Sequence, residues 1–136
     1  MKTFIRTIAG IFILLLASAG TRAYAAGTPL PIGPTSAEFL RLPPYCKARL
    51  GGSPEEKKAW DQQMGHQIFL HVHHYCFGLN SMNRARFESD KKLRSYYIER
   101  SIANFNYVIK AWPNSHPMAA QARRLKAQVE FMQMKR

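Results

Sequence analysis

The feature that most restricts the fold is a helical spacing of apolar residues, which proline interrupts only at segment ends. From His66 to about Arg86 there is no proline, and apolar side chains recur at intervals of three and four. The same spacing recurs in a segment that ends before Pro113 and in another that begins at Pro117. Since no segment shows sustained period-two alternation between hairpin turns, the sequence predicts an all-α fold.

Local signals mark where these helices begin and end. Ser53 is a good N-cap, and Pro54 costs no helical hydrogen bond at the first position of the helix. The two glutamates that follow face the positive end of the helix dipole. We expect Gly65 to bend or stop this first helix. Ser89 or Asp90 is expected to cap a later one.

Residues 1–26 have the pattern of an export signal. Two basic residues precede an apolar run over residues 8–19, and small residues at 23 and 25 suit a signal peptidase. The run is shorter than the roughly 20 residues that a spanning helix needs, so a retained anchor is the weaker alternative. We expect cleavage after Ala25 or Ala26 and a periplasmic or secreted product without a transmembrane span.

The remaining chain divides into two parts. Residues 27–36 hold three prolines and two glycines, which prevent a helix or a sheet ladder from continuing. The sequence therefore predicts an extended arm and turn over residues 27–52. A helical domain is predicted over residues 53–136.

The chain has two cysteines, Cys46 and Cys76. In an oxidising compartment they are most simply interpreted as one disulfide, which would tie the N-terminal segment to the middle of the domain. A free buried thiol and a metal thiolate are the alternatives. The absence of a C-x-x-C motif argues against thiol-disulfide oxidoreductase chemistry and c-type haem attachment.

The chain is strongly basic. Its formal net charge is +12, and loss of the predicted signal removes three basic residues and no acid, which leaves +9. In an exported protein this charge favours phosphate-bearing lipid or glycan surfaces rather than nucleic acid. A solvated helix face is the simpler interpretation. The candidate anion-binding residues are Arg123, Arg124, Lys126, Lys135 and Arg136.

Helix, short proline-containing turn and helix is the organisation of tetratricopeptide units, and particular residues fit that family. Phe105 and Pro113 stand eight apart, as the family's large apolar residue and turn proline do. Ser101 and Val108 occupy positions where small or aliphatic residues usually lie. Phe77-Gly78 matches the Leu-Gly pair of the family's first helix.

Over about residues 71–134 the chain thus resembles one and a half such repeats, although the interval between the two helices is longer than in the family. The resemblance implies antiparallel helical hairpins and a role in scaffolding or peptide binding. It also implies that Tyr75, Met82 and Asn83 lie on a concave partner-binding face. The leading hypothesis is therefore an exported, noncatalytic adaptor or scaffold that binds a protein or peptide partner in the cell envelope.

A histidine-rich stretch gives a second hypothesis, a periplasmic zinc or copper protein, because imidazole is a ligand for both metals. On a helix His71 and His74 lie together on one face, whereas His66 shares another face with the histidine at position 73. A third ligand would come from His66 or from His116. The spacing permits metal binding but does not demand it.

Sequence features of common enzymes are missing. There is no Gly-x-Ser-x-Gly motif, and a cysteine in a disulfide is not a resting nucleophile. Paired carboxylates suited to glycoside cleavage are scarce, and Gly51-Gly52 is an isolated pair rather than a phosphate-binding loop. The sequence therefore predicts no catalytic activity, no nucleic-acid binding and no required cofactor.

Overall fold

The computed structural model describes residues 27–134, and within this range every regular element is a helix, which confirms the all-α prediction. The elements are α1 (Ser36–Phe39), α2 (Pro44–Gly51), α3 (Pro54–Met64), α4 (His66–Phe87), α5 (Lys91–Ala111) and α6 (Pro117–Met134). The predicted export signal lies outside the described residues.

The N-terminal segment is less extended than predicted. Residues 27–35 have no helix, but α1 and α2 occupy much of the stretch up to residue 52. Thr35 and Glu38 form a capping box that starts α1. Pro44 lies within the stretch predicted as arm and turn, but it is the first residue of α2. A proline is tolerated there because its missing N–H has no partner within the helix.

The signals at the following helices are confirmed. Ser53 accepts a hydrogen bond from the N–H of Glu56, whose carboxylate accepts one from the N–H of Ser53. Asp90 caps α5 through the N–H of Leu93. Gly65 separates α3 from α4 with φ of 82°, a conformation that favours glycine.

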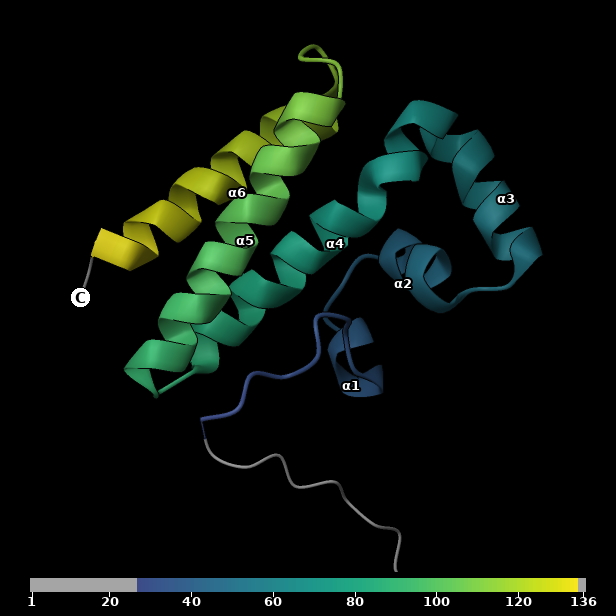
Figure 1. The fold of residues 1–136 in the computed structure, drawn as a ribbon. Coiled ribbons are helices and arrows are strands. Elements are labelled where there is room, and N and C mark those ends of the chain that lie inside the picture. Colours follow the sequence, from purple (N-terminus) through teal and green to yellow (C-terminus); the bar gives the residue numbers. More distant parts are fainter. Residues whose placement is uncertain (1–26, 135–136) are drawn as a thin grey trace, which may run out of the picture.

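Helices α4, α5 and α6 are the long elements. Helix α5 reverses the direction of α4, and α6 reverses the direction of α5 (Figure 1). Helix α5 packs against both α4 and α6. Helices α2 and α3 pack beside α4 on its other side. Helix α4 is therefore central.

Helices α4 and α5 pack tightly together at Gly78. A Cβ atom at this position would stand 2.8 Å from Cε1 of Phe105, which is fully buried. The hydroxyl of Ser101 donates a buried hydrogen bond of 2.8 Å to the Gly78 carbonyl oxygen. Small residues at 78 and 101 thus allow the two backbones to approach, and Phe105 fills the space beside them.

A disulfide joins Cys46 of α2 to Cys76 of α4, and both residues are fully buried. This confirms the predicted pairing. The link closes a loop with a sequence separation of 30, for which chain entropy gives about 3–4 kcal/mol of stabilisation. The N-terminal segment is thereby held to the central helix.

Replacement of Gly78 by alanine tests the helix contact. We expect Gly78→Ala to lower the free energy of unfolding by about 1–3 kcal/mol, because the added methyl group overlaps the Phe105 ring. Chemical denaturation measures the change. Gly51→Ala is the control, since a Cβ there meets no atom within 4 Å; equal stability of the two variants would contradict the contact.

Candidate functional site

A buried arginine of α4 binds the non-helical residues 27–35, which we call the arm. The Arg84 guanidinium donates hydrogen bonds to the carbonyl oxygens of Pro31 at 2.6 Å and Gly33 at 3.1 Å. It also donates to both carboxylate oxygens of Glu38, at 2.7 and 2.9 Å. Its side chain is 6% exposed. A planar guanidinium suits this arrangement because its donors are fixed in a fork.

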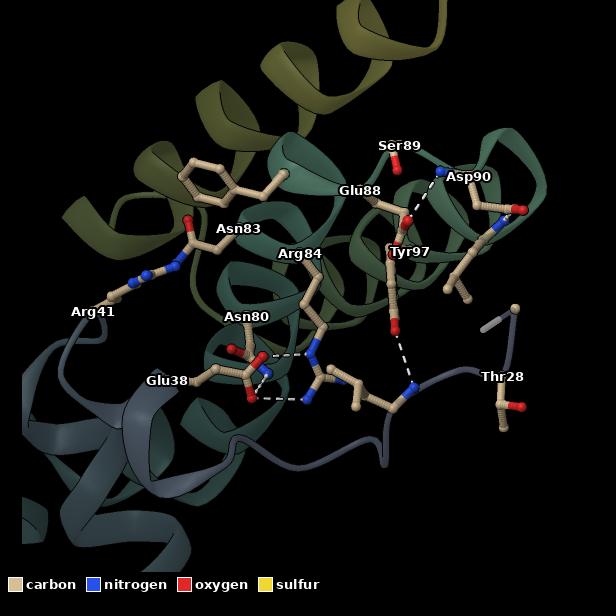
Figure 2. Close-up of a pocket in the computed structure, with 14 residues that line it drawn as sticks. Thr28, Glu38, Arg41, Asn80, Asn83, Arg84, Glu88, Ser89, Asp90 and Tyr97 are labelled. Carbon is tan, nitrogen blue, oxygen red and sulfur yellow. Dashed lines mark hydrogen bonds and ion pairs between the residues drawn. The ribbon is translucent and has the colours of Figure 1, made fainter. Parts of the chain in front are cut away.

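Helix α5 supplies a second contact with the arm. The Tyr97 hydroxyl oxygen accepts a hydrogen bond of 3.0 Å from the backbone N–H of Leu30. The Arg84 guanidinium lies over the Tyr97 ring, 5.6 Å from its centroid. Figure 2 shows Arg84 and Tyr97 facing the arm from the same side. Together they contact backbone groups of three arm residues, Leu30, Pro31 and Gly33.

A cavity of about 500 Å³ opens beside this contact, between the arm and the turn that joins α4 to α5. Phe87, which is 75% exposed, forms part of its lining, and the Arg41 guanidinium lies 5.4 Å from the Phe87 ring centroid. Leu93 adds a further apolar side chain. The remaining lining residues are Gly27, Thr28, Leu30, Glu38, Asn80, Asn83, Arg84, Glu88, Ser89, Asp90 and Tyr97.

Electrostatics hold Glu38 in its charged form. Burial by itself would raise the pKa of this carboxyl, but the hydrogen bond from Arg84, the backbone N–H of Thr35 and the Arg84 charge together lower the pKa from 4.5 to about 2. The Asn80 amide makes a longer contact with Glu38, at 3.4 Å. The carboxylate is therefore ionised at neutral pH and balances the buried guanidinium.

Two of the three predicted partner-binding residues are not on the surface. Tyr75 is 1% exposed and Met82 is 4% exposed, so both belong to the core. Tyr75 packs against Phe105 and Trp112, and its burial raises the pKa of its hydroxyl group. Only Asn83 lines the cavity. The three residues therefore do not form one partner-binding face, because other helices cover α4 on more than one side.

The histidines of α4 form a cluster with α5. His74 stacks on Tyr107 with ring centroids 3.7 Å apart, and His71 Nδ1 lies 3.2 Å from the Tyr107 hydroxyl. The Asn104 amide donates to the Arg100 carbonyl, so its oxygen faces His74 Nδ1 at 3.0 Å. With that oxygen as the acceptor, His74 donates from Nδ1.

The other predicted ligands have contacts of their own. His66 Nδ1 lies 2.9 Å from an Asp61 oxygen, and His116 Nδ1 accepts a hydrogen bond from the N–H of Met118. Across residues 27–134, no three side chains of the types His, Cys, Asp or Glu are grouped to hold a metal ion. His71 and His74 offer fewer ligands than zinc sites ordinarily use.

The basic residues of α6 are partly engaged. Arg123 donates to the side chain and the backbone carbonyl of Asn114, at 3.4 and 3.1 Å. Lys126 and Glu130 form an ion pair of 3.1 Å. Arg124 is exposed, whereas Lys135 and Arg136 lie outside the described residues.

Comparison with known proteins adds no further assignment, since no family model, curated protein or solved structure matches the chain. Among the described helices, none combines the length and apolar character that crossing a bilayer requires.

The arm contact should respond to acid through Glu38. Its folded-state pKa lies below the ordinary value, so its contribution to stability is present above about pH 4.5 and is lost as the pH falls toward 2. We expect the arm to detach in this window, as monitored by the NMR signal of the Leu30 amide. In Glu38→Gln the arm signal should lose this pH dependence; an unchanged titration would contradict the assignment.

Proposed function

We propose that this chain is an exported, noncatalytic helical adaptor that binds an extended segment of a protein partner in the cell envelope. The observation that carries the proposal is the contact of α4 and α5 with an extended segment of their own chain. Arg84 and Tyr97 bind its backbone carbonyl and N–H groups. Backbone recognition of this kind accepts many sequences, while neighbouring pockets select side chains.

The cavity beside the arm is the proposed selective pocket. It combines apolar contact area at Phe87 and Leu93 with charges of both signs at Arg41 and Asp90. Ligand sites commonly have this composition, with a few polar groups fixing the orientation of an apolar ligand. An apolar side chain of a partner segment would contact Phe87, and its backbone would contact the polar rim.

The repeat-like features support the same kind of role. The close packing of Gly78 with Phe105 and Ser101 is consistent with the helical hairpins that the tetratricopeptide resemblance implies. We assign partner binding to Asn83 together with Phe87 and its neighbours, and no longer to Tyr75 and Met82.

Export is part of the proposal. The disulfide between Cys46 and Cys76 suits an oxidising compartment, and the predicted signal over residues 1–26 would deliver the chain there. The periplasm or the cell exterior is the proposed location.

Peptide binding tests the proposed pocket. We would screen extended peptides with one central apolar residue and follow the Asn83 side-chain amide by NMR. A binding peptide should shift this signal, and Phe87→Asp should weaken its binding by about tenfold or more, because a central aromatic contact is lost and a charge is added.

Phe131→Asp is the matched control, since Phe131 is also an exposed phenylalanine but lies on α6. It should leave peptide affinity unchanged. Failure of all peptides to shift the Asn83 signal would contradict the proposed pocket. So would an equal loss of binding in both variants.

A further inference from the structure

Helices α2 and α3 pack beside α4 (Figure 1). A second concave surface lies at this junction. Its cavity of about 350 Å³ is lined by Arg49 of α2, by Lys57 and Lys58 of α3, and by Phe69 and Leu70 of α4, together with Asp61 and His66. We call this surface the basic notch. Its cations come from α2 and α3, which residues 52–53 connect, so the fold brings them together.

Arg49 is held in place at this notch. Its Nη2 donates to the Leu70 carbonyl oxygen at 3.3 Å, and its guanidinium carbon lies 5.6 Å from the Phe69 ring centroid. Its Nε is buried and has no hydrogen-bond partner in the described part of the chain. A carbonyl group and an aromatic ring hold Arg49 in place, but neither carries a negative charge. Its positive charge is therefore open to an anionic partner.

The charges around the notch are unbalanced. None of the ion pairs within residues 27–134 involves Arg49, Lys57 or Lys58. The acid that lines the cavity, Asp61, contacts His66 at 2.9 Å. Arg49 also lies close enough to His73 to affect it: burial, then His74 and then Arg49 lower the pKa of His73.

We propose that the basic notch binds a phosphate group that has apolar atoms attached. Guanidinium and ammonium donors suit phosphate oxygens, and Leu70, which is 45% exposed, offers apolar contact beside them. This chemistry is common to a phospholipid headgroup and to a free phosphate ester. The site is separate from the cavity beside the arm, so its failure would leave the peptide proposal untouched.

The first experiment titrates inorganic phosphate into protein produced from the full-length chain and follows the Arg49 Nε–H signal by NMR. We expect a saturable shift. Lys57→Gln combined with Lys58→Gln should weaken phosphate binding by about fivefold or more, because two charge-assisted contacts are lost. Lys91→Gln combined with Lys92→Gln removes the same charge at the start of α5 and should change affinity by less than about twofold.

The second experiment measures sedimentation with vesicles of phosphatidylcholine, alone or mixed with phosphatidylglycerol. Binding to the anionic vesicles that falls in the Lys57 and Lys58 double variant identifies a lipid headgroup as the source. Phosphate binding without vesicle binding identifies a soluble phosphate compound. Both results support the site.

Three results would overturn the proposal. One is that phosphate causes no saturable shift of the Arg49 signal and that vesicle binding does not depend on Lys57 and Lys58. Another is an equal loss in both lysine double variants, which would show a response to net charge. The third is a loss confined to Arg123→Gln combined with Arg124→Gln, which would place anion binding on α6.

Discussion

The position of the N-terminal arm depends on one buried cation. Arg84 is almost inaccessible to solvent, and its guanidinium is satisfied by one carboxylate and by carbonyl groups of the arm. Removing one partner of a buried ion pair typically costs about 3–5 kcal/mol, because the other charge is left without compensation. The arm is therefore an integral part of the fold, and it forms one wall of the cavity next to Phe87.

Helix α4 connects the other features to this contact. The disulfide fixes α2 to its middle, Gly78 lets α5 approach closely, and Arg84 near its end binds the arm. The cavity beside the arm and the basic notch are concave surfaces near opposite ends of this helix. The first presents apolar area with mixed charge, whereas the second presents an excess of cations. The two surfaces thus suit ligands of different chemistry.

The helices could be predicted from the sequence because their start signals are local, and the disulfide because only one pairing is possible. Ser53 and Asp90 are caps, and Cys46 and Cys76 are the only cysteines. The burial of Tyr75 could not be predicted, since it depends on how many helices cover α4. Arg84 gave no sequence signal either. Two of its four hydrogen bonds go to backbone carbonyl groups, which carry no residue identity, and all of its hydrogen-bond partners are about 50 positions away.

The property that matters most for the proposed function is the binding of an extended backbone by α4 and α5. Hydrogen exchange at the Leu30 amide tests this most directly, because the acceptor of that N–H is the Tyr97 hydroxyl group. We expect exchange at least about tenfold slower than in an unstructured peptide, and loss of that protection in Tyr97→Phe while α4 and α5 stay protected. Exchange at the unstructured rate in the unsubstituted protein would contradict it.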